Sequence, residues 1–330
     1  MNVDKDLQSI QEVRDLVKIA KEAQAEFKHF NQEQVDKVVK AMADAGYADA
    51  ERLAKLAFEE TGFGKWEDKV LKNQFGTRNV YNSIKDLKTV GVIDIQKNGK
   101  IVKIAEPMGV VAALIPSTNP TSTVMFKALI SLKTRNAIVA SPHPNAAKST
   151  YEAMKVLSDA AEAAGAPKGL MHVLSNPTLA GTEALMKDKN VSVILATGSN
   201  PMVKAAYSAG TPAYGVGSGN VPAFIEKTAD YKKAVADIVT GTTFDNGTLC
   251  SSEQSMIVDR SIKNQVIDEA KRLGCYFVND DEKKKLASVV INERRINPAI
   301  VGKPATYIAE LAGFTVPTDT KVLIAECIQV

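Results

Sequence analysis

Apolar residues in the first 87 positions recur three and four residues apart, which is the spacing of one face of an amphipathic helix. Residues 9–27, SIQEVRDLVKIAKEAQAEF, show this pattern clearly. Asn31 and Gln34 follow with the spacing of a capping box, so a second helix is expected to begin there. Residues 1–87 are therefore predicted to be helical.

Residues 90–105, VGVIDIQKNGKIVKIA, contain two alternating runs on either side of Asn98-Gly99. This arrangement predicts a β-hairpin with a type I′ turn, because Asn-Gly readily takes the positive φ angles of that turn. The outer positions are charged: Asp94, Lys97, Lys100 and Lys103. The hairpin is expected to be an exposed ribbon or an interface arm.

From Gly109 onward, short apolar runs alternate with helical stretches such as residues 149–165. The runs are GVVAALIP, NAIVASP, MHVL, VSVILATG and VPAFIE. Near-continuous apolar strands separated by helices predict a parallel sheet with both faces covered, and such sheets bind ligands beyond the carboxyl ends of their strands. After Thr243 a mixed region follows, with SEQSMIVD and KVLIAE as strands and KNQVIDEAKRLG and EKKKLASVV as helices.

Composition narrows the class of protein. The 330 residues are 45% hydrophobic and 24% charged, with a net charge of only +3, and the charges are mixed along the chain. This predicts a globular protein with no partner among nucleic acids or membranes. The polar start, MNVDKDLQSIQEV, does not resemble a signal peptide. The three cysteines are widely spaced, so neither a disulfide framework nor a metal site is expected, and the expected location is the cytoplasm.

Two strand ends offer candidate chemistry. LIPSTNPTST, residues 114–123, leads into a helix whose first amides suit an anion, and the Asn119 carboxamide can donate to a developing oxyanion. Taken alone, however, the segment favours a simple turn with an Asn cap. Thr197, Gly198 and Ser199 occupy the same position in ILATGSNPMV, without the G-x-G-x-x-G fingerprint. The glycines of YGVGSGN allow either the close approach of a ligand to the backbone or a flexible connection. His143 lies between two prolines and is either a surface residue or a functional one.

Cys250 lies in a polar turn, FDNGTLCSSEQ, where a buried structural cysteine is not expected. Only a thiolate attacks well, and a loop of backbone amides entering a helix lowers the pKa of a thiol. Asn246-Gly247 permits such a loop. Cys275 and Cys327 have apolar neighbours and are predicted to be core residues. Cys250 is therefore the candidate nucleophile, with an incidental loop cysteine as the alternative.

The segment FDNGTLCSSEQS resembles the nucleophile segment of CoA-acylating aldehyde dehydrogenases. IPSTNPTSTVMFKALISLKTRNAIVASPHP resembles the oxyanion and cofactor segment of that family, and ATGSNPMVKAAYSAGTPAYGVGSGNVP and AIVGKPATYIAELAGFTVP follow in the family's order. The likeness covers essentially the whole chain and is closest to the N-terminal half of bifunctional aldehyde–alcohol dehydrogenases. It implies an α/β, aldehyde dehydrogenase-like fold: a Rossmann-type parallel sheet domain, an incomplete α/β catalytic domain and a β-hairpin oligomerisation arm.

Within that fold the resemblance implies four parts. Residues 1–87 are the N-terminal helical part of the NAD-binding domain, 88–106 the hairpin arm, 107–242 the Rossmann-like NAD-binding domain, and 243–330 the incomplete catalytic domain. A homo-oligomer is implied, and a filament when the alcohol dehydrogenase half is attached. The family's module continues well past Val330, so the chain is expected to be C-terminally truncated.

The resemblance also implies the chemistry. The Cys250 thiolate attacks the aldehyde, Asn119 and the backbone amide of Cys250 hold the oxyanion, hydride passes to NAD, and coenzyme A takes the acyl group. In reverse, acetyl-CoA and NADH yield acetaldehyde. The implied cofactor contacts are Leu114, Ile115, Pro116, Ser117, Thr118, Asn119, Ser141, His143, Thr197, Gly198, Ser199, Gly215 and Gly217. No metal is implied.

Two departures from hydrolytic relatives bear on the acceptor and on the nucleotide. Gly215 stands where those enzymes carry a water-activating Glu, which favours CoA as the acyl acceptor. Their ribose-contacting lysine is replaced around Ser141 to His143. Two alternatives stay open: a truncated, non-catalytic fragment that binds nucleotide or forms oligomers, and a superfamily reductase with another acyl donor, such as an acyl phosphate.

Overall fold

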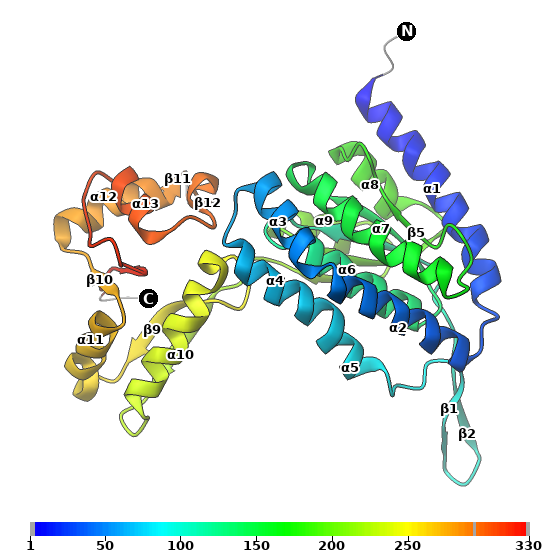
Figure 1. The fold of residues 1–330 in the computed structure, drawn as a ribbon, viewed down its shortest axis with the longest axis horizontal. Helices are drawn as coiled ribbons and strands as arrows, with labels where there is room; N and C mark the ends of the chain where they lie inside the picture. Colours follow the sequence, from blue (N-terminus) through cyan, green and yellow to red (C-terminus); the bar gives the residue numbers. More distant parts are fainter. Residues whose placement is uncertain (1–3, 293–294, 328–330) are drawn as a thin grey trace. The chain divides into compact units, whose positions relative to one another are not determined.

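The computed structural model describes residues 4–292 and 295–327. The first compact unit comprises Met1–Thr61 and Lys69–Ser218, and the second comprises Gly62–Asp68 and Gly219–Val330 (Figure 1). The chain thus divides after Ser218, whereas the boundary predicted between 242 and 243 falls within a helix, α10 (Tyr231–Thr243). Among the described residues, no helix combines the length and the apolar character needed to cross a bilayer.

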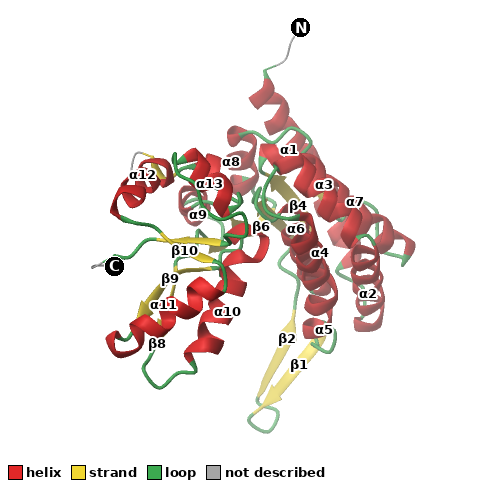
Figure 2. Ribbon diagram, turned by 60° about the vertical axis from the view of Figure 1, so that its left-hand side comes forward, coloured by secondary structure: helices red, strands yellow, loops and turns green. Residues whose placement is uncertain are grey.

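A five-stranded parallel sheet forms the centre of the first unit, as predicted. Its order is β5-β4-β3-β6-β7, and all neighbouring strands are parallel. The strands are β3 (Val110–Ile115), β4 (Ala137–Pro142), β5 (Met171–Val173), β6 (Val191–Thr197) and β7 (Ala213–Val216). Every residue of β3 and β4 is buried, because helices cover both faces of the sheet (Figure 2).

The helices of the first unit lie on both sides of this sheet. Next to α6 (Pro120–Lys133) and α7 (Ala147–Ala163) pack α2 (Gln32–Ala48) and α3 (Ala50–Thr61), while α1 (Lys5–Phe27), α8 (Leu179–Lys187) and α9 (Asn200–Tyr207) contact the sheet elsewhere. The capping box of α2 is confirmed: Asn31 Oδ1 accepts the Gln34 N–H and Gln34 Oε1 accepts the Asn31 N–H, both at 2.9 Å. Helix α4 (Trp66–Gln74), a π-helical turn (Phe75–Asn79) and α5 (Val80–Ile84) complete the predicted helical region.

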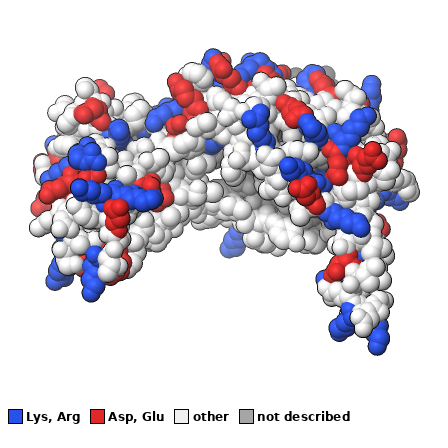
Figure 3. Space-filling model, turned by 60° about the horizontal axis from the view of Figure 1, so that its bottom comes forward, with Lys and Arg blue, Asp and Glu red and all other residues white. Residues whose placement is uncertain are grey.

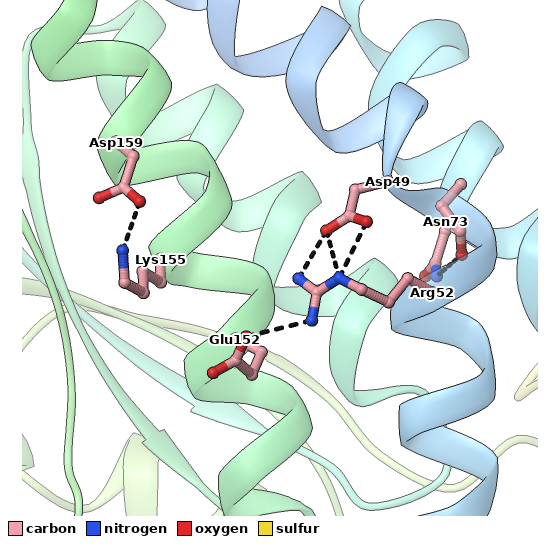
Figure 4. A network of polar contacts seen from close by, with 7 residues as sticks. Asp49, Arg52, Asn73, Glu152, Lys155 and Asp159 are labelled. Atoms are coloured by element: carbon pink, nitrogen blue, oxygen red, sulfur yellow. Dashed lines mark hydrogen bonds and ion pairs between the residues drawn. The ribbon is translucent and has the colours of Figure 1, made fainter.

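A polar network joins α3 to α7. The Arg52 guanidinium contacts Asp49 at 2.6 Å and Glu152 of α7 at 3.2 Å, and buried Asn73 of α4 lies nearby (Figure 4). Because Arg52 is about half exposed, each pair contributes only about 0.2–1 kcal/mol. The network therefore contributes little to the stability of the contact between α3 and α7.

The predicted hairpin is confirmed as β1 (Gly91–Gln96) and β2 (Ile101–Ala105), which pair antiparallel. Asn98 and Gly99 have φ angles of 52° and 87°, and the Lys100 N–H donates to the Lys97 carbonyl, as a primed turn requires. The hairpin projects from the helices of its unit, and Figure 3 shows uncharged surface between its charged residues. Its large apolar side chains are exposed on both faces: Val92, Ile93, Ile95, Ile101, Val102 and Ile104.

Both ends of the hairpin are anchored to the first unit. Gln32 Oε1 accepts the backbone N–H of Thr89 at 2.8 Å and of Val90 at 3.1 Å. The buried Arg135 guanidinium donates to the Ala105 carbonyl at 2.9 Å and to the Lys28 carbonyl at 2.6 Å. The arm is therefore held in place at its base, while its apolar strands extend into solvent.

The second unit is a smaller α/β assembly. Strand β8 (Val221–Ile225) pairs parallel with β9 (Glu253–Val258), and β10 (Cys275–Phe277) pairs parallel with β13 (Val322–Ile324). Helices α10 and α11 (Lys263–Arg272) pack on a core that includes Ile225, Val235 and Cys275. The remaining elements are α12 (Asp280–Val290), β11 (Ile291–Asn292), β12 (Arg295–Ile296) and α13 (Ala305–Leu311).

Three sequence predictions need correction. VPAFIE was expected in the large parallel sheet but forms β8, because only residues 217–220 separate it from β7 and a parallel crossover needs about a dozen or more. AYGV was missed as a strand and forms β7. Cys275 is buried as predicted, but Cys327 is exposed, since β13 ends at Ile324.

Candidate active site

The residues predicted to bind the cofactor all come from one edge of the large sheet. Strands β3, β4, β6 and β7 are parallel, so their carboxyl ends share an edge; the pairing of Leu114 with both Ser141 and Ala196 shows this register. From β3 the chain proceeds to β4 and β5 on one side, then returns to β6 on the other. The carboxyl ends of β3 and β6 therefore form a topological switch point, where doubly wound sheets bind their ligands.

Two lysines of α4 donate hydrogen bonds to the loop after β3, which contains Asn119. Asn119 precedes α6 but makes no side-chain capping bond, so the simple cap explanation does not apply. Lys72 Nζ donates to Asn119 Oδ1 at 2.5 Å, and Asn119 Nδ2 donates to Thr118 Oγ1 at 3.0 Å. Lys69 Nζ donates to the Thr118 carbonyl at 3.2 Å. Sequence reasoning missed both lysines.

The end of β4 carries Ser141 and His143 in different surroundings. Ser141 is buried, and its hydroxyl lies 2.8 Å from that of Thr182. His143 is exposed, and its Nδ1 accepts the Asn145 N–H at 3.2 Å. Ser141 is thus engaged inside the first unit, whereas the imidazole of His143 reaches solvent.

Glycines lie at the carboxyl ends of β6 and β7, on the other half of the same sheet edge. The Gly198 N–H donates to the Val216 carbonyl at 3.1 Å, after Thr197, the last residue of β6. Ser199 precedes α9 without capping it. A Cβ on Gly217 would overlap Asn200 Oδ1, and one on Gly215 would lie 2.5 Å from Val203 Cγ1. A side chain at 215 would therefore require the Val203 and Tyr207 side chains of α9 to move.

Lys127 of α6 bridges the two strands at the switch point. It is buried, and its Nζ donates to the Leu114 carbonyl at 2.8 Å and the Leu195 carbonyl at 2.7 Å. Burial lowers the pKa of Lys127 from 10.5 to about 7. The amine thus joins β3 to β6 directly below the strand ends.

This lysine is expected to make stability depend on pH. Between pH about 7 and 10.5 the unfolded chain binds more protons at Lys127 than the folded one, so the free energy of unfolding rises with pH in this window. The slope is at most about 1.4 kcal/mol per pH unit. Urea unfolding of wild type and Lys127→Met, followed by circular dichroism from pH 7 to 10, measures it. The free energy of unfolding of wild type should increase relative to that of Lys127→Met as the pH rises. Parallel pH profiles of the two proteins would contradict the lowered pKa of Lys127.

The nucleophile loop, residues 244–252, holds Cys250 on the second unit. The thiol-bearing residue is exposed, whereas burial raises the pKa of Cys275 to about 11. The loop continues into β9 and not into a helix, because residues 253–258 pair with β8. The expected helix start beside the thiol is therefore absent. The position of Cys250 as candidate nucleophile is set instead by the conformation of the loop itself.

That conformation is left-handed over three consecutive residues. Asp245, Asn246 and Gly247 have φ angles of 47°, 51° and 70°. For residues other than glycine this costs about 1–2 kcal/mol each, and Asp and Asn tolerate it best. The sequence predicted that Asn246-Gly247 permits a loop here, and the structure adds Asp245 to the left-handed run.

A buried carboxylate stabilises this strained turn. Asp245 is fully buried and accepts the Lys65 N–H at 2.6 Å and the Thr248 hydroxyl at 2.5 Å. Its own N–H donates to the Asp68 carboxylate at 2.7 Å, and the Asn246 amide donates to the Gly302 carbonyl at 3.0 Å. Strain maintained by such contacts is typical of functional loops.

Gly219, the third glycine of the YGVGSGN run, lies against the backbone of the nucleophile loop. A Cβ there would overlap the Cys250 carbonyl oxygen and lie 2.7 Å from its carbonyl carbon. Only glycine therefore lets the start of β8 approach the backbone of the nucleophile. The glycine-rich YGVGSGN run predicted a close backbone approach, and at its third glycine the group that approaches is the nucleophile loop.

Comparisons with known proteins agree with the resemblance to aldehyde dehydrogenases. The model of the aldehyde dehydrogenase family matches residues 6–290. The bifunctional aldehyde-alcohol dehydrogenase AdhE of Escherichia coli K12 is 48% identical over 96% of this chain and 36% of its own length. The chain spans about a third of the length of such curated relatives.

Solved structures extend the comparison. An acetylating aldehyde dehydrogenase from Geobacillus thermoglucosidasius is 54% identical with a TM-score of 0.97, covering 99% of this chain and 72% of that chain. A propionaldehyde dehydrogenase from Rhodopseudomonas palustris with bound propionyl-CoA is 29% identical with a TM-score of 0.85, covering 96% of this chain and 70% of that chain.

Proposed function

The chain belongs to the aldehyde dehydrogenase family, and from this premise we propose that the protein interconverts acetyl-CoA and NADH with acetaldehyde, NAD and CoA through a thioester on Cys250. The observation that carries the proposal is the exposed thiol on a strained loop held by the buried Asp245 carboxylate. Such a loop fixes a reactive group before substrate arrives.

In the reducing direction, the Cys250 sulfur bonds to the acetyl carbon, and CoA leaves as a thiolate. The N–H groups of Asn119 and of Cys250 donate to the oxyanion formed during this exchange. The buried Cys275 is a poor alternative nucleophile, because its raised pKa keeps it protonated near neutral pH.

The carboxyl edge of the large sheet suits a dinucleotide. It combines a switch point, the exposed His143 and the small residues Gly198 and Ser199. We assign NAD to the strand ends there: Leu114, Ile115, Pro116, Ser117, Thr118, Asn119, Ser141, His143, Thr197, Gly198, Ser199, Gly215 and Gly217. When bound, NADH supplies the hydride that reduces the acyl group.

The acceptor is CoA and not water. No carboxylate stands at Gly215, and a Cβ there would already press on Val203 of α9. Without a general base, water attacks a thioester slowly, whereas a thiol needs little assistance. The relative with bound propionyl-CoA supports this choice.

The protein also forms homo-oligomers through the hairpin, in the cytoplasm, and extends into filaments where an alcohol dehydrogenase half is attached. The exposed apolar strands β1 and β2 support an association surface, because both faces of the ribbon carry large aliphatic side chains. The free cysteines support a reducing compartment.

Trapping the acyl-enzyme tests the catalytic proposal. Incubation with acetyl-CoA, without NADH, is expected to add the mass of one acetyl group to the intact protein, and peptide mapping is expected to place it on Cys250. Acetyl phosphate, tested in parallel, is expected to give no adduct. Absence of an adduct from acetyl-CoA would refute the proposal, and labelling by acetyl phosphate alone would identify a different acyl donor.

A further inference from the structure

Helix α4 directs two buried lysines at the loop after β3. Lys69 and Lys72 are only 2% and 7% exposed, and they lie three residues apart, on one face of the helix. Lys69 contacts the backbone carbonyl of Thr118, while Lys72 contacts the side-chain oxygen of Asn119. Lys72 thus contacts the side chain to which the oxyanion role is assigned.

The Lys72 contact fixes which end of the Asn119 carboxamide faces which way. An ammonium carries donors only, so the atom 2.5 Å from Lys72 Nζ must be the amide oxygen. The amide nitrogen consequently lies on the other side, where it donates to Thr118 Oγ1 at 3.0 Å. Asn119 therefore presents N–H donors, and not a carbonyl oxygen, away from α4.

The position of Lys72 is itself fixed by its neighbour on α4. Asn73 is fully buried; its Nδ2 donates to the Ala50 carbonyl at 2.9 Å and its Oδ1 accepts the Thr121 hydroxyl at 2.7 Å. A Cβ on Gly76, in the π-helical turn that follows α4, would lie 2.8 Å from the Ser122 carbonyl oxygen, so this turn touches α6 at backbone distance. Helix α4 is thus attached to the first turn of α6, immediately after Asn119.

We propose that Lys72 is a positioning residue for the acylation reaction, acting through Asn119. Its ammonium binds the amide oxygen, so the amide nitrogen is the end that an oxyanion would meet on the side away from α4, and the positive charge on the amide oxygen makes the N–H groups stronger donors. A freely rotating carboxamide would offer its oxygen to the oxyanion part of the time, which is repulsive. This inference rests on the proposed function of Cys250 and Asn119.

The test compares Lys72→Met, which keeps the length but removes the donor, with Lys72→Arg, which restores one. The readouts are the maximal rate of Cys250 acetylation, the acetyl-CoA concentration at half-maximal rate and the NADH Kd. Lys72→Met is expected to lower the maximal rate more than about 10-fold, with less than about threefold change in the other two, because only the oxyanion donor is misaligned. Lys72→Arg is expected to recover most of the rate.

A double-mutant cycle with Asn119→Ala separates positioning from general damage. If Lys72 acts through Asn119, adding Lys72→Met to Asn119→Ala should slow acetylation by less than about threefold. Lys69→Met is the matched control: it removes a second buried α4 lysine from the same loop, and its effect should be the same in both backgrounds.

The outcomes distinguish a failure of the role proposed for Lys72 from a failure of the proposed function. A normal rate in folded Lys72→Met, or a full additional loss on top of Asn119→Ala, would overturn the role of Lys72 while the proposed function stands. No acetylation of the wild-type protein would overturn the proposed function and this inference with it. If Lys72→Met does not fold by circular dichroism, Lys72→Gln takes its place in the same cycle.

Discussion

Replacing Cys250 with alanine is expected to lower acetyl transfer from acetyl-CoA by more than about 10⁴-fold, because covalent catalysis has no other route once its nucleophile is removed. The NADH Kd should change less than about threefold, since Cys250 is not among the residues assigned to the nucleotide and a nucleophile is not needed to hold it. Intact-mass analysis after incubation with acetyl-CoA measures the transfer, and NADH fluorescence titration measures the binding.

Cys327→Ala is the matched control for this variant. Cys327 is the other exposed cysteine among the described residues, so its loss tests whether any accessible thiol suffices. The control should acetylate like wild type. An adduct that persists in Cys250→Ala and disappears in Cys327→Ala would show that Cys327, and not Cys250, is the acetylated residue. An adduct that persists in both variants would show that Cys250 is not the sole acceptor.

The parts of the fold that were predicted correctly are those that local pattern determines. Strands β3 and β4 are buried on both faces, so their apolar runs are nearly continuous and end at turn residues. The hairpin follows from Asn98-Gly99, which takes its turn without help from the rest of the chain. The sequence also predicted that Leu114, Ser141 and Thr197 lie at one edge of the sheet, because parallel strands align their carboxyl ends.

Prediction failed where pairing over long sequence separations decides the structure. VPAFIE has the composition of any interior strand, and only its pairing with residues 253–258 places it in the second unit. AYGV is short, lies at the sheet edge and contains Gly215, so it carries little strand signal. Cys327 follows an apolar run, but its strand ends three residues earlier.

The candidate site shows the same limit. Cys250 and Asn119 stood out because of their local context, but the groups that hold them did not. Lys72 is 47 residues from Asn119, and Lys65 is 180 residues from Asp245, so a single sequence contains no signal that pairs them. Their roles emerge only when the folded chain brings a buried cation or amide against a specific oxygen.

Gly219→Ala is expected to displace Cys250 and slow its acetylation by about 100-fold, which is the usual cost of moving a reacting atom by about 1 Å. The added Cβ would overlap the Cys250 carbonyl oxygen and lie 3.3 Å from its Cα. These are backbone atoms, so no side-chain rotation relieves the overlap, and either β8 or the nucleophile loop must move. Asp245 anchors the loop on its other side through Lys65 and Thr248, so movement in either direction breaks a contact.

Acetylation by acetyl-CoA and alkylation by iodoacetamide, both followed by peptide mass spectrometry, distinguish a displaced thiol from a merely destabilised unit. A displaced thiol should acetylate about 100-fold more slowly yet alkylate within a few-fold of wild type, because alkylation needs exposure and acetylation needs alignment. Faster hydrogen exchange confined to residues 244–258 should accompany it. Asn220→Ala, an exposed neighbour on the same segment, is the control and should behave like wild type. An unchanged acetylation rate in Gly219→Ala would mean that the loop tolerates the shift and that the close approach of β8 does not position the nucleophile.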